Sequence, residues 1–411
     1  MVNFVEFAFF FYIFVGLYLT SLLFFIYISN RKKLFYYPIG KPEPVSIVIP
    51  CYNAEKTIGQ AIESLLRLNY PREMIEIIVV DDKSTDDSVR IVEEYTGKHS
   101  NIKLIKMDKN SGGAAEPTNL GVLNAKYNYV SVTDDDSSPE PDALIKMIGF
   151  LQDDEKVAAV TCAVMARNSR TFMQKLQNVE YTIISWSRKL LDCVDSVYVT
   201  PGPFALYRKK NLIEVGLFDS KNMTQDIEIV WRLLFHGYKA RMCLAARVYS
   251  ETPTKIKAWW RQRVRWNIGG TQSILKYKKF MFRKGMLGAF IIPFFSFSLF
   301  LGLFGLGIFI YLLTTRLWVK YLSTKYSIYA GSTILRFQDL TFNPSVLNFF
   351  GIALFLSGLF FTLIGLSVMN EPRFKNKNIL NILFYMLVYL ALYPFVMVNG
   401  LYKLLRGKYS W

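Results

Sequence analysis

Long apolar runs lie near both ends of the chain. Residues Phe4–Ile28 form about 25 positions in which Glu6 is the only charged side chain. About 20 apolar residues in a helix cross the hydrocarbon core of a bilayer. A cleaved signal peptide is disfavoured for the first run, because it is too long and lacks both a preceding basic region and a following small-residue cleavage site. The pattern predicts four membrane helices, the other three at Met286–Leu313, Leu347–Met369 and Ile379–Leu401.

Basic residues beside these runs bear on how the helices cross the membrane. Arg31, Lys32 and Lys33 follow the first run, and short loops rich in Lys and Arg remain in the cytoplasm. We therefore expect the next segment to be cytoplasmic. Four crossings would place the basic C-terminal tail outside, and the basic stretch Arg316–Asn343 raises the same conflict, which a re-entrant or interfacial segment would resolve. The topology of residues 316–346 and of the tail stays open.

Between the ends, short apolar runs alternate with segments of helical spacing. Near-continuous apolar strands separated by helices are typical of an α/β fold with a mostly parallel sheet. The expected strands are Val45–Ile49, Ile75–Val80, Ile102–Ile105 and Tyr129–Val132, and the expected helices are Thr57–Leu68, Ser84–Tyr95, Ala114–Ala125 and Pro141–Phe150. We predict a membrane helix at 1–29, a cytoplasmic α/β domain at 30–250, interface helices at 251–285 and a membrane region of about three spans at 286–411.

Composition and charge narrow the class of protein. The 411 residues are 52% hydrophobic and carry a formal net charge of +17. This hydrophobicity excludes a disordered chain, and four scattered cysteines with two histidines suggest neither a disulfide scaffold nor a zinc site. Ten basic residues and no acidic ones lie within Thr252–Lys284, interleaved with apolar residues directly before an apolar run. This pattern is typical of an amphipathic segment on an anionic membrane surface, so a lipid bilayer is the expected partner and nucleic acid is not.

Two clusters of acidic residues follow predicted strands. Asp81 and Asp82 come after one strand, and Asp134, Asp135 and Asp136 come after another. A solvated loop would account for one such cluster, but open α/β sheets bind ligands beyond the carboxyl ends of their strands, which favours a site. Carboxylates two positions apart suit Mg²⁺ or Mn²⁺, which would bridge phosphate oxygens. The glycine-rich motifs of dinucleotide-binding and P-loop proteins are missing from the sequence.

Six motifs in order carry a resemblance to a known family. They are Ser46–Pro50 with Tyr52 and Asn53, Val80–Asp86, Thr133–Asp136, Pro201–Phe204 with Tyr207 and Arg208, Thr224–Ile227, and Gln262–Trp266. Together they resemble the inverting family 2 glycosyltransferases of the GT-A fold, and in particular the membrane-embedded synthases of chitin, hyaluronan, cellulose and poly-N-acetylglucosamine. The motifs cover roughly Val45 to Gly270. The family commonly has Glu where this chain has Gln225, a departure that bears on acceptor specificity.

The resemblance implies a role for each motif residue. Asp226 would be the general base on the acceptor hydroxyl. The other implied roles are nucleotide and donor binding by Asp81, Asp82, Asp134, Gln262 and Arg265, metal binding by Asp134 and Asp136, and acceptor binding by Trp266, Gly202 and Pro203.

The last motif has a spacing that suits this chemistry. Gln262, Arg265 and Trp266 stand at i, i+3 and i+4, so on a helix they share one face. A guanidinium binds diphosphate through paired hydrogen bonds, and an indole suits the apolar face of a sugar. An alternative is that Trp259, Trp260 and Trp266 only anchor an interfacial helix.

The favoured function is transfer of a sugar, most simply N-acetylglucosamine, from a UDP-sugar to a growing β-linked polysaccharide, with export of the chain through the membrane region. Two alternatives stay open: addition of one sugar to a lipid-linked acceptor, and a non-catalytic protein that binds a nucleotide sugar. The sequence leaves the sugar, the linkage, the chain length and the oligomeric state open. The expected location is the cell membrane, with several spans and a cytoplasmic catalytic domain.

Overall fold

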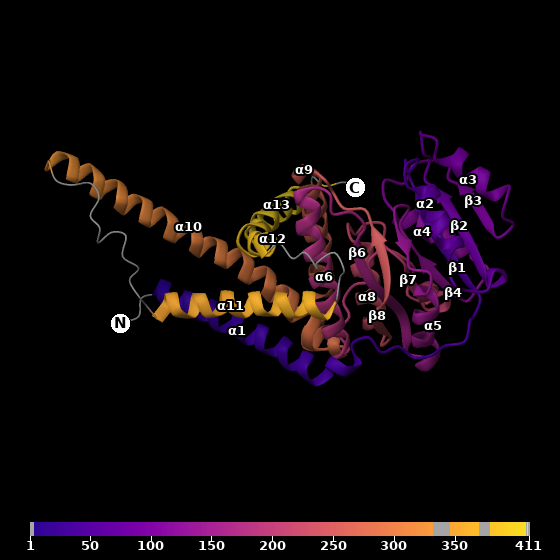
Figure 1. The fold of residues 1–411 in the computed structure, drawn as a ribbon, viewed down its shortest axis with the longest axis horizontal. Coiled ribbons are helices and arrows are strands. Elements are labelled where there is room, and N and C mark those ends of the chain that lie inside the picture. The colour runs from indigo at the N-terminus through magenta and orange to yellow at the C-terminus, as the bar shows by residue number, and fades with distance from the viewer. Residues whose placement is uncertain (1–3, 332–345, 370–378, 408, 410–411) are drawn as a thin grey trace.

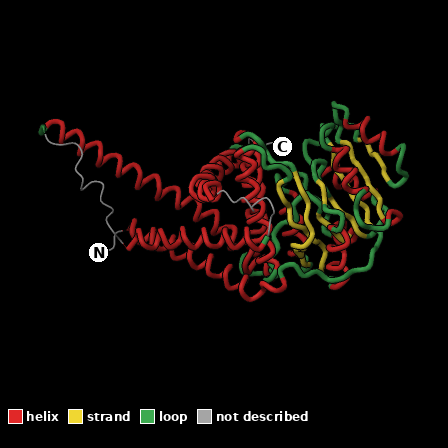
Figure 2. Tube along the Cα trace, viewed as in Figure 1, coloured by secondary structure: helices red, strands yellow, loops and turns green. Residues whose placement is uncertain are grey.

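The computed structural model describes residues 4–331, 346–369, 379–407 and 409. A domain of strands and short helices occupies one end of the molecule, and long apolar helices extend from it (Figures 1 and 2). The α/β domain contains an eight-stranded sheet in the order β3-β2-β1-β4-β7-β6-β8-β5. Its strands are β1 (Val45–Cys51), β2 (Ile75–Asp81), β3 (Ile102–Lys106), β4 (Tyr129–Val132), β5 (Ser138–Pro139), β6 (Val157–Ala166), β7 (Ala205–Arg208) and β8 (Lys239–Ser250).

The four predicted strands are present, and each ends within two residues of its expected bounds. β1 and β2 are buried along their whole length, as expected for strands covered on both faces. The sheet is more mixed than the sequence suggested: β1 pairs in parallel with β2 and β4, but β7 is antiparallel to both β4 and β6. The described sheet therefore contains four parallel and three antiparallel pairings.

Helices cover both faces of the sheet. One apolar core contains residues of α2 (Ile58–Leu66), α3 (Ser88–Thr96) and α5 (Ala143–Asp153). A second core contains residues of the helices on the opposite face: α4 (Ala115–Asn124), α6 (Phe172–Asp192), α7 (Lys209–Glu214) and α8 (Gln225–Phe235). Pro117 does not break α4, because it stands in the first turn, where a missing N–H leaves no intrahelical bond unmade.

Helix α6, which the sequence did not predict, joins the sheet to the long apolar helices. A capping box begins it: Thr171 accepts a bond from the Gln174 N–H, and the Gln174 side chain accepts one from Thr171. One face packs on β6. Trp186, fully buried, lies 4.4 Å from the ring centre of Phe361 and 5.7 Å from that of Tyr27. Since these two rings belong to apolar helices from opposite ends of the chain, α6 fixes them on the α/β domain.

The described residues include four helical stretches long and apolar enough to cross a membrane. They are α1 (Phe4–Asn30); the π-helical turn Leu287–Ile291 continued by α10 (Ile292–Tyr329); α11 (Val346–Val368); and a stretch made of α12 (Ile379–Phe384), the turns Tyr385–Tyr389 and Leu390–Leu392, and α13 (Tyr393–Leu405). α1 packs along α11, and α10 packs against α13 (Figure 1). The last stretch is irregular before Pro394, whose ring displaces the backbone of the preceding turn.

The region after the second apolar run begins as a direct continuation of that run. Arg316–Tyr329 belongs to α10, which passes through it as one unbroken helix. At about 1.5 Å per residue, its 38 residues span about 57 Å, nearly twice a hydrocarbon core of about 30 Å. The continuous helix therefore carries the basic residues of this stretch beyond the length that a bilayer core accommodates. Residues 332–345 lie outside the described part of the chain.

Candidate active site

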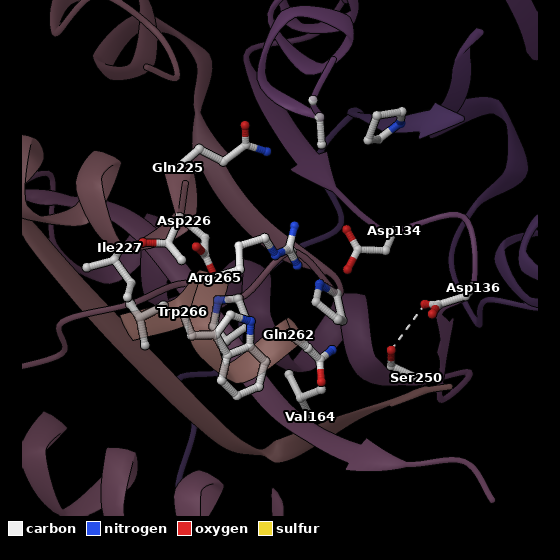
Figure 3. A pocket seen from close by; sticks show the side chains of 18 of the residues that line it. Asp134, Asp136, Val164, Gln225, Asp226, Ile227, Ser250, Gln262, Arg265 and Trp266 are labelled. Carbon is white, nitrogen blue, oxygen red and sulfur yellow. Dashed lines mark hydrogen bonds between the residues drawn. The ribbon is translucent and has the colours of Figure 1, made fainter. Parts of the chain in front are cut away.

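A cavity of about 800 Å³ opens beyond the carboxyl ends of β1, β2 and β4, with α8 and α9 (Ile256–Tyr277) on its other side (Figure 3). Its volume is in the range of small-molecule sites. Nine of the ten residues predicted to form the site line it: Asp82, Asp134, Asp136, Gly202, Pro203, Asp226, Gln262, Arg265 and Trp266. The tenth, Asp81, is not among the lining residues. Chain segments nearly 200 positions apart thus meet in one cavity.

The two acids after β2 have different surroundings. Asp82 accepts hydrogen bonds from the backbone N–H and the hydroxyl of Ser111, both at 2.8 Å, and so holds the loop whose Gly112 and Gly113 line the cavity. Asp81 instead accepts the Ser84 N–H at 3.2 Å and stabilises the turn that follows β2. Of this pair, Asp82 is the residue placed to meet a ligand.

Three consecutive carboxylates, Asp134, Asp135 and Asp136, follow β4 and line the cavity. The Asp136 side chain accepts bonds from the hydroxyls of Ser137 and Ser250, at 3.0 and 3.1 Å (Figure 3). Burial raises the pKa of Asp134, Asp135 and Asp136, and the charge of Asp136 adds to the increase for the first two; the pKa of Asp135 rises to about 7. Bringing a cation to this position would relieve the repulsion.

The donor set at this position fits a hard divalent cation. Asp134 and Asp136 offer oxygen ligands, which Mg²⁺ and Mn²⁺ prefer. Within the described residues, no three His, Cys, Asp or Glu side chains lie close enough together to hold a metal by themselves. An ion here would therefore complete its coordination with water and with phosphate oxygens of a substrate, as Mg²⁺ commonly does.

The candidate base is near the start of α8. Asp226 is the second residue of this helix, where the helix dipole favours a negative charge. Burial raises its pKa, and the guanidinium of Arg265 opposes that increase. Arg265 lies between Asp226 and Asp134 (Figure 3). A single cation therefore faces both the candidate base and the candidate metal site.

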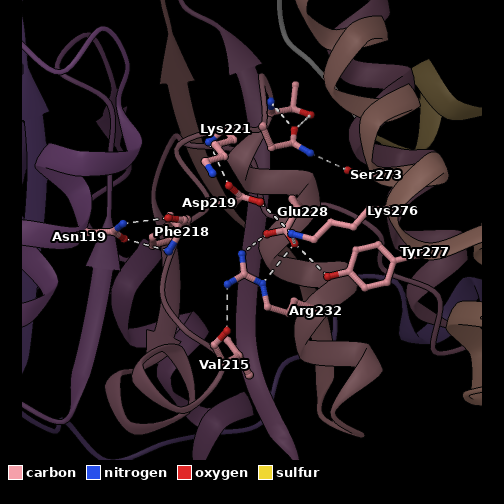
Figure 4. Close-up of polar contacts among 12 residues, drawn as sticks. Asn119, Val215, Phe218, Asp219, Lys221, Glu228, Arg232, Ser273, Lys276 and Tyr277 are labelled. Atoms are coloured by element: carbon pink, nitrogen blue, oxygen red, sulfur yellow. Dashed lines mark hydrogen bonds and ion pairs between the residues drawn. The ribbon is translucent and has the colours of Figure 1, made fainter.

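A buried polar cluster joins α8 to α9 (Figure 4). The Glu228 side chain, which is fully buried, forms an ion pair with Arg232 and accepts bonds from Lys276 at 2.7 Å and from the Tyr277 hydroxyl at 2.9 Å. Lys276 also binds Asp219 at 2.8 Å. Because Glu228 is two residues from Asp226, the cluster holds the candidate base in place relative to the helix that carries Gln262, Arg265 and Trp266.

These three residues are helical and line the cavity, as the spacing predicted. Between them stands Arg263, whose role the sequence did not reveal. Its guanidinium carbon lies 3.9 Å from the ring centre of Trp266, and its Nη1 donates to the Gln262 side chain at 2.7 Å. Arg263 therefore positions two of the three cavity-lining residues.

Arg263 is itself held by a buried network beneath the cavity. It forms an ion pair with Glu180 of α6 and donates to the Tyr393 hydroxyl at 3.0 Å. Tyr389 and Tyr393 both donate to Glu180, and Trp259 donates its indole N–H to Tyr389. The interpretation of Trp259 as a membrane-surface anchor is wrong, because this side chain is fully buried in the network.

The close contact of α8 and α9 depends on one glycine. A methyl group added at Gly269 would overlap the hydroxyl of Thr224 and lie 2.5 Å from its backbone nitrogen, which is fixed by a 2.8 Å bond to Asn222. We predict that Gly269→Ala destabilises the protein by about 1–3 kcal/mol, measured by thermal unfolding in detergent. Gly270→Ala is the matched control: nothing lies within 4 Å of its added methyl group, and alanine favours a helix. Equal stability of the two variants would refute the prediction.

Other lining residues carried no sequence signal. Arg188 of α6, Tyr198 and Ser250 come from segments without a motif. Arg188 follows the helical spacing of a buried face, and only the packing of α6 behind the cavity reveals its position.

Comparisons with known proteins agree with this geometry. The glycosyl transferase family 2 model matches residues 46–216. A poly-β-1,6-N-acetyl-D-glucosamine synthase of Staphylococcus epidermidis is 27% identical over 413 residues, which cover 98% of this chain and 95% of that protein. A protein of the same name from Staphylococcus aureus (strain COL) is 29% identical over 280 residues, 67% of each chain.

One solved structure supports the fold alone. A mannosyltransferase of Pyrobaculum calidifontis, determined in complex with GDP-Man and Mn²⁺, aligns with a TM-score of 0.60 at 17% identity, covering 97% of this chain and 100% of the other. With the mixed sheet and the family match, these findings show that the chain contains, at residues 46–216, a family 2 domain of an inverting glycosyltransferase of the GT-A fold, and that it is homologous to the poly-β-1,6-N-acetyl-D-glucosamine synthases.

Proposed function

We propose that this chain transfers N-acetylglucosamine from UDP-N-acetylglucosamine to the end of a growing β-linked polysaccharide. The observation that carries the proposal is the convergence of Asp226, Arg265 and Asp134 on one cavity, in a chain whose relatives over almost its full length are named for making such a polymer. We further propose a multi-pass protein with a cytoplasmic catalytic domain, since Arg31–Lys33 directly follow the first apolar helix.

In this mechanism Asp226 accepts the proton of the acceptor hydroxyl as that oxygen attacks the anomeric carbon of the donor. The bond to the diphosphate breaks on the opposite side, so the configuration inverts in one displacement, and UDP leaves. A positioned base of this kind contributes about 10²–10⁴-fold to a rate. The proton remains on Asp226 until the product departs.

Charge at the leaving group is the second requirement. Arg265 would donate hydrogen bonds to the diphosphate, and a fixed cation at the place where negative charge develops stabilises the transition state. Asp134 and Asp136 would hold Mg²⁺ or Mn²⁺, which when bound neutralises part of that charge. Asp82 would act on the nucleoside side, both directly and through the loop bound to Ser111. Gln262 and Trp266 would face the sugars.

The deciding experiment measures UDP release by the purified full-length protein over a panel of UDP-sugars, with Mn²⁺, with Mg²⁺ and with chelator. We expect release from UDP-N-acetylglucosamine that depends on the metal, and a ladder or polymer when the products are sized. A single glycolipid product would support one-sugar transfer to a lipid-linked acceptor instead. Nucleotide binding without any release would indicate a non-catalytic protein and refute the proposal.

Gly202 provides a separate test of the metal site. A methyl group at this position would lie 2.5 Å from Oδ1 of Asp134, so Gly202→Ala displaces that carboxylate. Disturbing the support of a metal ligand typically costs 10–100-fold in affinity or activity. We expect the Mn²⁺ concentration for half-maximal activity to rise at least about tenfold, while Gly270→Ala titrates as the unchanged protein. An unaltered Mn²⁺ titration would remove Asp134 from the proposed metal site.

A further inference from the structure

Helix α6 presents one cation to the cavity to which the mechanism above gives no role. Arg188 lines the cavity and is 4% exposed. Among the described residues, its Nε and Nη1 atoms have no hydrogen-bond partner. Buried polar groups in proteins are nearly always hydrogen-bonded, so a buried guanidinium with unused donors requires an explanation.

The next residue along the same helix shows what a buried cation of structural type looks like. Lys189, 5% exposed, binds Asp192 at 2.7 Å and the Met242 carbonyl at 2.9 Å. Arg263, 1% exposed, is likewise matched by Glu180. A structural role for Arg188 would call for comparable partners at Nε and Nη1. Leaving hydrogen-bond donors unmatched inside a protein is destabilising. Unmatched buried donors are typical of side chains that bind a ligand.

Its position relative to the other charges indicates which ligand. Arg188 interacts with Tyr198 through a hydrogen bond and through charge, and with Cys162 and Asp226 through charge, whereas Arg265 interacts through charge with both Asp134 and Asp226. The Cys162 thiol lies against the carbonyls of Pro203 and Phe204, at 3.9 and 3.6 Å. Arg188 therefore lies near Asp226 and near Cys162, which contacts the Pro203–Phe204 segment, whereas Arg265 lies between Asp226 and the candidate metal ligand Asp134 (Figure 3).

The neighbouring wall suits a saccharide. Tyr181, Ile184 and Val164 line the cavity with Arg188, and apolar and aromatic side chains match the C–H faces of a sugar ring. A sugar offers hydroxyl, ring and acetamido oxygens, all of which accept bonds from a guanidinium with five donors in a planar fork. The proposed function already assigns the donor diphosphate to Arg265 and to the cation that Asp134 and Asp136 would hold, which leaves Arg188 for the sugar.

We propose that Arg188 binds the acceptor sugar, donating hydrogen bonds from Nε and Nη1 to its oxygen atoms and so placing its hydroxyl at Asp226. This inference rests on the proposed function and adds to it a residue that selects for acceptors rich in hydrogen-bond-accepting oxygens. Arg188 is a binding residue in this proposal, and the donor and its diphosphate do not need it.

The test compares Arg188→Met and Arg188→Lys with the unchanged full-length protein in detergent. Acceptor KM is measured with a β-linked N-acetylglucosamine oligosaccharide at saturating UDP-N-acetylglucosamine, and the affinity for the oligosaccharide is measured by calorimetry. For Arg188→Met we expect the acceptor KM to rise at least tenfold and the affinity for the oligosaccharide to fall at least tenfold, while the donor KM stays within twofold. The melting temperature should be equal or higher, because a buried guanidinium with unmatched donors has been removed. Arg188→Lys keeps the positive charge but has fewer hydrogen-bond donors. Its acceptor KM and its affinity for the oligosaccharide should lie between those of the unchanged protein and those of Arg188→Met. Arg170→Met, which removes an exposed arginine just before α6, is the control.

Two results with Arg188→Met would overturn the inference. The first is an acceptor affinity within twofold of the unchanged protein in Arg188→Met. The second is a lower melting temperature with equal losses for donor and acceptor, which is the result expected of a structural residue. Calorimetry measures binding without turnover. If the unchanged protein binds the oligosaccharide but transfers no sugar, the proposed function is refuted, and the comparison with Arg188→Met still decides the role of Arg188. If the unchanged protein fails to bind the oligosaccharide, the assignment of Arg188 is wrong.

Discussion

Replacing Asp226 with asparagine is expected to lower kcat by about 10²–10⁴-fold, the usual contribution of a positioned general base. The amide has nearly the shape of the carboxylate but does not accept the proton of the attacking hydroxyl. Donor binding should be retained, because Arg265 and the acids after β4, to which the proposal assigns the diphosphate and the metal, are unchanged in this variant. The measurement is sugar transfer from labelled UDP-N-acetylglucosamine, with UDP binding measured on the same preparation.

The pH dependence gives this prediction a second readout. Since burial raises the pKa of Asp226, its ionised form is lost at a higher pH than for an exposed aspartate. Activity should therefore fall as the pH is lowered through that raised pKa, and the corresponding limb should vanish in Asp226→Asn. Asp153→Asn, at an exposed position on α5, is the control. A variant that binds UDP normally and keeps more than a tenth of the activity would remove Asp226 from the role of base.

Replacing Arg263 with methionine is expected to cause the largest loss of stability, about 3 kcal/mol. Removing one partner of a buried ion pair costs about 3–5 kcal/mol, because the other charge stays buried without compensation. Glu180 would retain the hydroxyl donors of Tyr389 and Tyr393, which places the expected loss at the lower end. The measurement is thermal unfolding of the full chain in one detergent. Activity should fall as well, because Trp266 and Gln262 both lose their contact with the guanidinium.

A double variant separates the charge from the packing. Glu180→Gln removes the charge that Arg263→Met leaves uncompensated, so the combination should be more stable than Arg263→Met alone; such non-additivity is the sign of direct coupling. Arg261→Met, at an exposed position of the same helix, should be close to neutral. Strictly additive losses, or a single variant as stable as the unchanged protein, would show that the pair contributes little.

Local pattern was enough to predict the elements that carry the chemistry. The strand Ile75–Asp81 is apolar throughout because it is covered on both faces, and the helix with Gln262, Arg265 and Trp266 follows from their spacing. The apolar runs predicted four helices long and apolar enough to cross a membrane. These features depend on residues close together in the sequence, and they can therefore be predicted from the sequence alone.

Other parts of the site depend on contacts that the chain order does not reveal. Asp81 and Asp82 are adjacent and chemically alike, and only the direction in which each side chain leaves the end of β2 gives Asp82 a place in the cavity. Before folding, Arg263 is one of ten basic residues in a charged stretch. Its burial against Glu180 turns it from a presumed surface charge into a support for Trp266.

The sequence by itself thus determined the α/β domain, the apolar helices and nine residues that line the cavity, because strand burial, helix spacing and span length are local properties. Tertiary structure alone decided that α6 would lie behind the cavity, that Trp259 would be buried and that Arg188 would face Asp226. The physical reason is distance along the chain: Glu180 and Tyr393 bind each other across 213 positions. Such contacts form because α6, α9 and α13 bury their apolar faces against one another. This packing brings together polar groups that lie far apart along the chain.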